Sequence, residues 1–413
     1  MRTSVSPSPR PSPPPRGRGR TVVRFWTNLC ASKVRRAFGT AEDGRRVSLS
    51  PSEGERAVRG LSLVLLLTLL AAFSSSAAER IVLVAGGGSD TNTTSPIKAT
   101  AAKLSGPFGV DFDFAGNLYL VEMTGHRVRK LDTNGVLTVI AGTGEKGDAG
   151  GLARKAQFNG IHNLAISQDQ IFLADTWNNC IRVLDLRAGT VARVIGTGEK
   201  GFSGDGGGAS LAKFGGIYCV SIAENNHIYL ADLDNRRIRA VDPISGKVRT
   251  VAGNGMRGVP SDGAIATNAP LVDPRAVIAD RAGRIYILER GGNALRMVDT
   301  NGVIRTVAGT GAKGFSGDGG EAIHATLNGP KHLCFDHDGS VLIADSENHV
   351  IRRYAPRDGK ITRVAGTGKK GSKGVGGPPL ECELSQPHGV TVHRDGTLYI
   401  SDSSNHRVLR IEK

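Results

Sequence analysis

Short runs of alternating hydrophobic and polar residues, separated by glycine-containing turns, make up most of the chain after residue 80. One stretch shows four such runs in succession, at Gly109–Phe114, Asn117–Glu122, Arg127–Asp132 and Val136–Ala141. Alternation with a period of two is typical of β-strands with one buried face. Asn134-Gly135, between the last two runs, is a strong hairpin turn. The pattern therefore predicts four antiparallel strands over residues 106–144.

This four-strand pattern recurs at a nearly constant interval. The tetrapeptide Ala141-Gly-Thr-Gly144 returns with small changes at 195–198, 252–255, 308–311 and 365–368, and Ala85-Gly-Gly-Gly88 precedes all of them. From Gly86, the steps to the matching glycines are 56, 54, 57, 56 and 57 residues. A repeat of this length with four short strands is typical of one propeller blade.

The two ends of the repeat region complement each other. Six units are present, and the last one stops at Lys413, after its third strand. Arg80–Ala85 is a strand that belongs to no unit of its own. We therefore predict an all-β fold, a six-bladed β-propeller of four-stranded antiparallel blades that is closed by the N-terminal strand completing the last blade.

The N-terminal region has a different character. Ser4–Arg20 is rich in Pro, Arg and Ser, and Leu61–Phe73 is a 13-residue apolar run followed by the small residues Ser76-Ala77-Ala78. An apolar run of this length with an A-x-A-like end is typical of a signal peptide. We predict a disordered tail or mis-called start (1–57), a signal peptide (58–78) and the propeller (79–413). The alternatives are a cytoplasmic tail with a signal anchor, or a transit peptide. A cleaved signal would make the protein secreted, periplasmic or part of the cell envelope.

Charge and cysteines add little to this picture. The chain carries +15, but the first 60 residues hold 13 Lys/Arg and 4 Asp/Glu, a net +9, so that only +6 remains for the propeller. This mild excess gives no strong indication of a nucleic-acid partner. Cys180, Cys219, Cys334 and Cys382 show no CxxC spacing, so we interpret them as isolated buried or paired thiols and not as a metal site.

Several segments resemble the NHL repeat. The resemblance is clearest at Gly396–Val408 (GTLYISDSSNHRV) and at Ala344–His349 (ADSENH), and it extends over roughly residues 80–413. The loops Gly201–Gly207 (GFSGDGG) and Gly314–Gly320 are similar to those of bacterial secreted members, and gluconolactonase-like propellers are related to this family. Unit four is the most degenerate. The resemblance implies a six-bladed propeller whose function lies in its loops.

Strand order predicts which face carries those loops. Turns between strands one and two, and between three and four, are short and lie on one face, the lower face; the long links between blades lie on the other, the upper face. One residue per blade should stand at the upper mouth of the central channel, just inside strand one. These six are Phe108, His162, Tyr218, Arg275, Lys331 and His388. Aromatic and basic groups together suit an anionic or planar ligand, although the same residues could simply plug the channel.

Three other motifs have structural interpretations. Gly142–Gly147 matches GxGxxG, but five copies at the blade period, each followed by a loop and not a helix, exclude a dinucleotide site. One acidic residue ends strand two of every blade, where it can hold the turn and pair with arginine. These are Glu122, Asp175, Asp232, Glu289, Asp345 and Asp402. Asp205 and Asp318, in the GFSGDGG loops, are a poor Ca²⁺ ligand set and are expected to shape the loops.

The sequence lacks the complete set of metal-binding residues for either of two catalytic alternatives. His162 and His388 occupy positions where lyases of this fold place zinc-binding histidines, but the third histidine is absent and His332 is one residue out of register. Gluconolactonase-like enzymes hold a divalent metal in the channel with Glu, Asn and Asp. The mouth residues include no acid, and Asn163 and Asp273 lie near but not at those positions.

We therefore expect an exported, non-catalytic binding or interaction module that acts through its upper face. The alternative is a metal-dependent gluconolactonase-like hydrolase with its site in the central channel. Phe108, Tyr218, Arg275, Lys331, His162 and His388 form the expected ligand site, with the last four as electrostatic anchors. The expected partner is a protein or an anionic saccharide, and neither nucleic acid nor, after signal cleavage, a membrane. No cofactor or metal is expected; Ca²⁺ or Zn²⁺ would accompany the hydrolase alternative.

Overall fold

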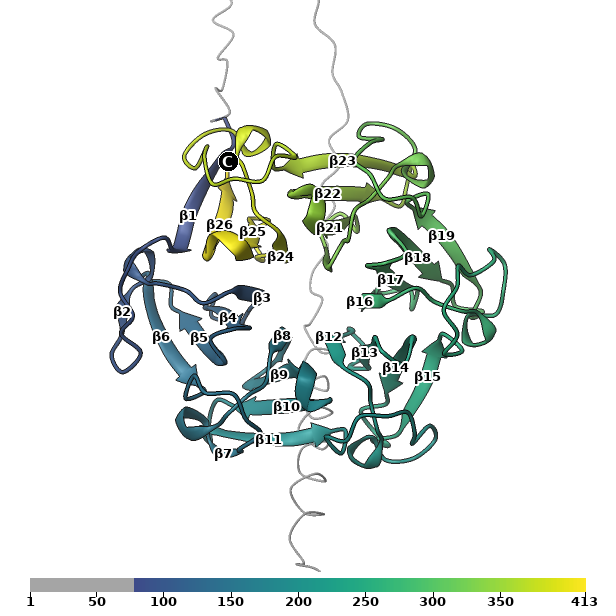
Figure 1. Ribbon diagram of the computed structural model, residues 1–413, viewed down its shortest axis with the longest axis horizontal. Coiled ribbons are helices and arrows are strands. Elements are labelled where there is room, and N and C mark those ends of the chain that lie inside the picture. Colours follow the sequence, from purple (N-terminus) through teal and green to yellow (C-terminus); the bar gives the residue numbers. More distant parts are fainter. Residues whose placement is uncertain (1–77) are drawn as a thin grey trace, which may run out of the picture.

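The computed structural model describes residues 78–413, which form six β-sheets around a central channel (Figure 1). The predicted tail (1–57) and the predicted signal peptide (58–78), except for its last residue, lie outside the described residues.

From the channel outward, blade one contains β3 (Pro107–Phe112), β4 (Leu118–Glu122), β5 (Arg127–Leu131) and β6 (Val136–Ala141), and blade two contains β8 (Ile161–Ser167), β9 (Gln170–Asp175), β10 (Cys180–Asp185) and β11 (Thr190–Ile195). In the same order, blade three contains β12 (Ile217–Ile222), β13 (Ile228–Asp232), β14 (Arg237–Val241) and β15 (Val248–Ala252), and blade four contains β16 (Pro274–Ala279), β17 (Ile285–Glu289), β18 (Ala294–Val298) and β19 (Ile304–Ala308). Blade five contains β20 (His332–Phe335), β21 (Val341–Asp345), β22 (Val350–Ala355) and β23 (Lys360–Ala365), and blade six contains β24 (Pro387–Val392), β25 (Leu398–Asp402), β26 (Arg407–Glu412) and β1 (Arg80–Gly86).

The predicted closure of the ring is confirmed. Strand β1 pairs antiparallel with β26, with Ile81 opposite Ile411 and Leu83 opposite Leu409. The two ends of the propeller therefore share one sheet, and blade six has the same four main strands as the other blades (Figure 1). Closure removes the free sheet edge that would otherwise separate the first blade from the last.

The recurring glycine ends the outer strand of each blade. Gly142 has φ +93°, and a Cβ atom there would lie 2.3 Å from the carbonyl oxygen of His126. Its N–H donates to the carbonyl of Ala153 at 2.9 Å, which draws the link between blades back against the strand it leaves. Only glycine combines this backbone conformation with so close an approach.

The same links cover the outer edges of the sheets. β2 (Ile97–Lys98) pairs with β6 and β7 (Gly151–Leu152) pairs with β11, so that blades one and two gain a fifth strand. In blades three to five, single antiparallel bridges occupy the corresponding place, and in blade six Ile81 exchanges backbone hydrogen bonds with Gly376 and Gly377. The outer strands therefore offer little unpaired edge to other chains.

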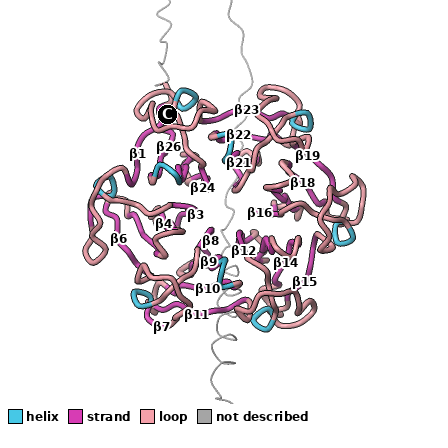
Figure 2. Tube along the Cα trace, in the orientation of Figure 1, coloured by secondary structure: helices cyan, strands magenta, loops and turns pink. Residues whose placement is uncertain are grey.

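Within residues 78–413, helical structure is confined to single turns in the loops (Figure 2). These 3₁₀ turns are η2 (Ala99–Ala101), η3 (Ala153–Lys155), η4 (Thr176–Asn178), η5 (Ala209–Leu211), η6 (Ala266–Asn268), η7 (Ala322–His324), η8 (Ser346–Asn348), η9 (Pro379–Glu381) and η10 (Ser403–Asn405). No helix among residues 78–413 is long and apolar enough to cross a membrane.

The hydrophobic core lies between the blades. Ile181 of blade two, for example, belongs to the same buried cluster as Phe214, Ile217 and Leu230 of the next blade and its link. The cysteines from Cys180 onward are unpaired within the described part of the chain, and three of these four are buried, which matches the isolated thiols expected from their spacing.

Replacing Ile81 with Ala tests the closure. Ile81 is fully buried, so we expect the substitution to lower the free energy of unfolding by about 2–5 kcal/mol, through lost apolar contact and a residual cavity. Urea denaturation of the full chain measures the change. Arg80→Ala is the matched control, since its side chain is largely exposed and should change stability by less than about 0.5 kcal/mol. Equal effects of the two substitutions would contradict a closed ring.

Candidate functional site

The six residues predicted at the channel mouth occupy equivalent places in the six blades. Five are the second residues of strands β3, β8, β12, β16 and β24, and the sixth immediately precedes β20. In that order they are Phe108, His162, Tyr218, Arg275, His388 and Lys331. Their equivalence follows from the common register of the innermost strands, which fixes where each strand begins.

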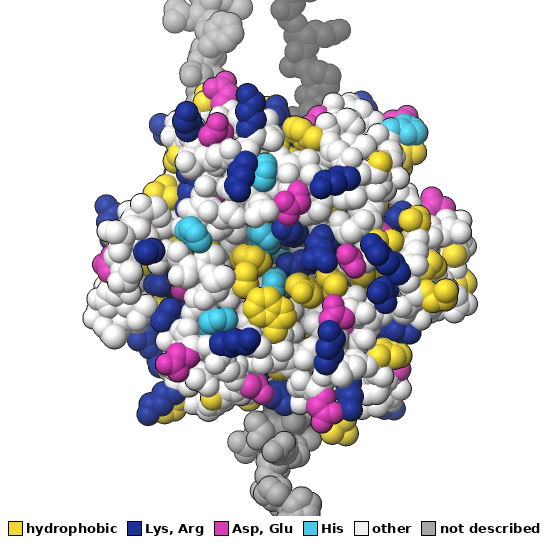
Figure 3. All heavy atoms as spheres, viewed as in Figure 1, with side chains coloured by type: hydrophobic (Ala, Val, Ile, Leu, Met, Phe, Trp, Pro, Cys, Tyr) yellow, Lys and Arg dark blue, Asp and Glu magenta, His cyan; other side chains and the backbone are white. Residues whose placement is uncertain are grey.

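Five of these side chains contact one another in sequence around the mouth. The His388 ring stacks on Phe108 with centroids 4.0 Å apart, and Phe108 meets the edge of His162 at 5.3 Å. The His162 ring lies 4.6 Å from that of Tyr218, and the guanidinium carbon of Arg275 lies 4.3 Å from the Tyr218 centroid. On the face seen in Figure 3, basic side chains gather beside hydrophobic and histidine side chains at the centre of the ring.

Arg275 differs from every other buried arginine in the described part of the chain. The other six each form an ion pair with a carboxylate; these are Arg129, Arg182, Arg239, Arg296, Arg352 and Arg407. Arg275 is 5% exposed, forms no ion pair with a described residue, and has no hydrogen-bond partner for Nε. Its one hydrogen bond is a long one of 3.4 Å, from Nη1 to the Tyr218 carbonyl.

This isolated charge is costly in the free protein. Burial lowers the pKa of Arg275 to about 10, so the side chain remains protonated at neutral pH. A buried charge without a counter-ion loses its hydration and gains no pairing energy in return. Arg275 is therefore the strongest indication of an anion site in the described residues.

The neighbouring cations are already paired. Lys331 Nζ lies 2.7 Å from Oε1 of Glu347, and Arg290 lies 3.3 Å from the carboxylate of Asp273. Burial lowers the pKa of Lys331, against the opposing effect of Glu347. Asp273, which sequence reasoning placed near the mouth, thus neutralises a cation there.

The surroundings of the two mouth histidines favour their neutral form. Burial, with the positive charge of Arg275 and Lys331 nearby, lowers the pKa of His162 and His388 well below the usual value of 6.5. Their Nδ1 atoms donate to the carbonyls of Gly160 and Gln386, at 2.8 and 2.7 Å. Nε2 of each neutral ring is then left as a hydrogen-bond acceptor.

Sequence reasoning missed one aromatic residue of the mouth. Trp177, in turn η4, meets His162 edge-on with centroids 5.5 Å apart and is 47% exposed. It fits against Gly160, where a Cβ atom would lie 2.4 Å from the indole. A signal was present, because Trp177 stands two residues after Asp175, where other blades carry small or charged residues such as Thr124 and Glu347.

Below the mouth, a polar contact crosses the channel. Asn163 Nδ2 of blade two lies 2.9 Å from Nε2 of His332 in blade five, on the opposite side of the ring. Val220 N donates to Oδ1 of Asn163, and Val390 N lies 3.3 Å from Nδ1 of His332; a neutral ring accepts a hydrogen bond at only one of its two nitrogens. Burial lowers the pKa of His332 to about 4. His332, which lies one residue out of register with the mouth positions, thus connects blade five to blade two and does not complete a histidine triad.

A cavity of about 170 Å³ lies along the channel, with Asn163 and His332 in its wall. Asp111, which sequence reasoning assigned only to a strand, also lines this cavity. The carboxylate of Asp111 accepts hydrogen bonds from the N–H groups of Phe112 and Ile166, at 2.8 and 3.1 Å. Burial raises its pKa to about 6. One carboxylate is far short of the oxygen ligands that Ca²⁺ needs.

The six acidic residues that end the second strands are structural, as expected. Each is fully buried and accepts a hydrogen bond of 2.5–2.8 Å from the backbone N–H of a residue 16 or 17 positions earlier. Each also pairs with one of the six buried arginines named above. These carboxylates therefore tie the link between blades to the turn after strand two.

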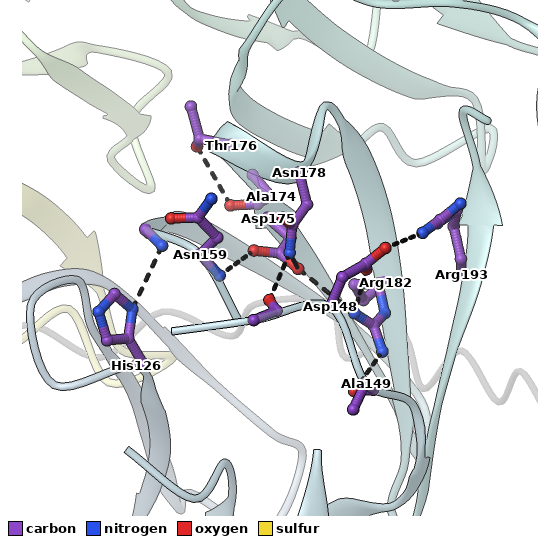
Figure 4. A network of polar contacts seen from close by, with 12 residues as sticks. His126, Asp148, Ala149, Asn159, Ala174, Asp175, Thr176, Asn178, Arg182 and Arg193 are labelled. Carbon is purple, nitrogen blue, oxygen red and sulfur yellow. Dashed lines mark hydrogen bonds and ion pairs between the residues drawn. The ribbon is translucent and has the colours of Figure 1, made fainter. Parts of the chain in front are cut away.

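Loop aspartates add a second acid in three blades. Asp205 and Asp318 lie 2.7 and 2.8 Å from the guanidinium groups of Arg239 and Arg352, so they shape the GFSGDGG loops as expected. Figure 4 shows the equivalent network in blade two, where Arg182 bridges Asp148 and Asp175 at 3.0 and 3.4 Å. Cys180 lies close to these carboxylates, but burial raises its pKa to about 12 and Arg182 already neutralises them. We therefore assign no metal to this cluster.

The length of the buried acid is matched to the residue three positions later. Four blades combine Asp with Asn, whose Nδ2 atom donates to the carboxylate at 2.7–2.9 Å. Blades one and four combine Glu with Gly, as Glu122 with Gly125 and Glu289 with Gly292. A Cβ atom at Gly125 would lie 2.8 Å from Cβ of Glu122. The longer acid thus occupies the space that asparagine takes elsewhere.

Comparison with known proteins agrees with this architecture. Residues 384–411 match the NHL repeat and residues 244–316 the Teneurin NHL domain. The chain is 27% identical over 288 residues (66% of this chain) to Protein SUPPRESSOR OF QUENCHING 1, chloroplastic, of Arabidopsis thaliana, and 25% identical over 333 residues (73%) to NHL repeat-containing protein 2 of Bos taurus. It spans only 27% and 46% of those proteins. An auxiliary nutrient binding protein from Bacteroides thetaiotaomicron shares the fold with a TM-score of 0.60 at 16% identity, covering 81% of this chain and 76% of that one.

The matched acid and glycine generate a test in blade one. Gly125→Asn alone should destabilise the protein by about 1–3 kcal/mol, because the new side chain overlaps Glu122. Adding Glu122→Asp recreates the pair found in the other blades, so the double variant should be more stable than the sum of the single effects by at least about 0.5 kcal/mol. Thermal or urea unfolding measures both. Strictly additive effects would show that the two positions are independent.

Proposed function

This chain is an NHL-repeat six-bladed β-propeller, and we propose that it is a non-catalytic binding module that holds an anionic ligand at its upper channel mouth. The observation that carries this proposal is Arg275, the one buried arginine among the described residues without a carboxylate. A ligand anion would supply the missing counter-charge. Aromatic rings from three blades follow one another around the mouth from Arg275, in the order Tyr218, His162 and Phe108, and offer apolar contact to the rest of a ligand.

An unpaired buried cation has little value for folding. Replacing a buried charge by an uncharged side chain of similar volume is often neutral or stabilising, whereas a binding site retains the charge for its ligand. A residue that only plugs the channel needs no charge, whereas a residue that binds an anion needs its charge even at a cost in stability. Export, which the sequence predicts from residues 58–78, remains part of the proposal and lies outside the described residues.

Arg275→Met separates these roles. We expect the variant to be as stable as the parent or more stable by about 1–4 kcal/mol, because a desolvated charge is removed. Its affinity for benzoate, a planar carboxylate, should fall at least about tenfold. Trp177 fluorescence reports binding in a Trp26→Phe background, which leaves one tryptophan in the full chain. Arg281→Met, an exposed arginine on the lower face paired with Glu224, is the control.

The charge of the mouth predicts the response to pH and salt. Since the pKa values of His162 and His388 lie well below 6.5, both rings stay neutral from pH 8 to pH 6, and benzoate affinity should not change over that range. Substituting Arg275 and Lys331 together should also reduce the salt dependence of binding. Stronger binding on acidification, with a midpoint near pH 6.5, or loss of stability in Arg275→Met, would contradict the proposal.

The alternative, a metal-dependent gluconolactonase-like hydrolase, rests on the channel carboxylate of Asp111. Elemental analysis of the purified full chain tests it. We expect neither Ca²⁺ nor Zn²⁺ at a stoichiometric level, because one carboxylate is a poor ligand set for either ion. One bound ion per chain, lost in Asp111→Asn, would favour the hydrolase over the binding module.

A further inference from the structure

The charges at the mouth indicate the valence of the ligand's anionic group. Lys331 is balanced by Glu347 and Arg290 by Asp273, and the two histidines are neutral. Arg275 alone leaves one positive charge without a partner. A single carboxylate restores neutrality, whereas a phosphate monoester would bring a charge of about −1.5 to −2 into a largely buried site. The mouth is therefore matched to a carboxylate.

The other half of the mouth accepts hydrogen bonds. His162 and His388 donate through Nδ1 to backbone carbonyls, so each presents an unprotonated Nε2 atom. Neither Nε2 atom forms a hydrogen bond with a described residue. A ligand that satisfies them must carry donors such as hydroxyl groups at a distance from its carboxylate. Simple fatty or aromatic acids do not have this combination.

Trp177, which is 47% exposed, lies beside the His162 acceptor. The face of an indole is electron-rich and attracts the weakly positive C–H groups of a ligand. Trp177 and Arg275 are separated by the rings of His162 and Tyr218, with successive contacts of 5.5, 4.6 and 4.3 Å. A ligand that lies along this row of rings spans more than one six-membered ring.

We infer that the ligand is an acidic saccharide of two or more hexose units, of which one hexuronate places its carboxylate in the mouth. One carboxylate pairs with Arg275, hydroxyl groups donate to Nε2 of His162 and His388, and the C–H face of a neighbouring sugar stacks on Trp177. This inference rests on the proposed anion-binding function and specifies its ligand. It assigns to Trp177 the recognition of the sugar ring and to Arg275 the recognition of charge.

Isothermal titration of the full chain with α-1,4-linked trigalacturonate tests the inference. Its neutral counterpart, α-1,4-linked galactotriose, has the same rings without the carboxylates. We expect trigalacturonate to bind at least about tenfold more tightly. Arg275→Met should abolish this preference, while Trp177→Ala should weaken both ligands about five- to fiftyfold. Trp177→Phe, which keeps a ring face, should bind better than Trp177→Ala, and Phe114→Ala, an exposed aromatic in a lower turn, should change nothing.

The outcomes separate this inference from the function on which it rests. Binding of benzoate that depends on Arg275, together with equal binding of trigalacturonate and galactotriose, would overturn the saccharide and leave the anion site intact. No binding of either benzoate or trigalacturonate would overturn both. Displacement of benzoate by inorganic phosphate at lower concentration than by acetate would overturn the carboxylate assignment. Unfolding curves recorded for each variant exclude misfolding as the cause of lost binding.

Discussion

The structure depends on one antiparallel pairing, between β1 and β26, which joins residues some 330 positions apart in sequence into one sheet. The seam between this sheet and blade one carries hydrogen bonds that also occur at other seams. Ser403 Oγ donates to the Pro107 carbonyl at 2.5 Å, as Ser346 does to Pro387 at 2.6 Å. His406 Nδ1 accepts a hydrogen bond from Gly106 N across the same seam. Closure thus makes blade six equivalent to the rest, and without it the inner strands would not converge on a common mouth.

Within each blade, the corresponding constraint is a buried carboxylate. A buried acid is expensive, and burial raises the pKa of Asp175, Asp232 and Asp345 to about 6 despite their arginine and amide partners. These carboxylates fix the relative positions of three segments, because one carboxylate binds the link, the turn and the third strand at once. The exchange of Asp–Asn for Glu–Gly in two blades shows that this geometry is kept while the residues that build it vary. We interpret the network as the device that holds the upper loops in place.

The fold and the mouth positions could be predicted because both follow from a repeat. The period of the glycines defined the blades, and the position of Phe108 in one unit located His388 in another. The charge states could not be predicted, because they depend on contacts across blades and turns. Glu347 neutralises Lys331 from 16 residues away, and Asn163 meets His332 from 169 residues away. Trp177 was missed because it lies on a turn between two strands, and the strand pattern predicts no role for the residues of such a turn.

Comparison of the seven buried arginines among the described residues indicates what distinguishes the channel mouth. Six of them lie between sheets and loops, and each has a carboxylate from its own blade, as the energetics of buried charge require. Among the described residues, Arg275 has no such partner, at the place where all six blades meet. If Arg275 served only to fill the channel, an uncharged side chain would do so at lower cost. The unpaired charge therefore supports the proposal of a ligand anion at the mouth, and the histidines and aromatic rings beside it suit the hydroxyl and ring contacts proposed for that ligand.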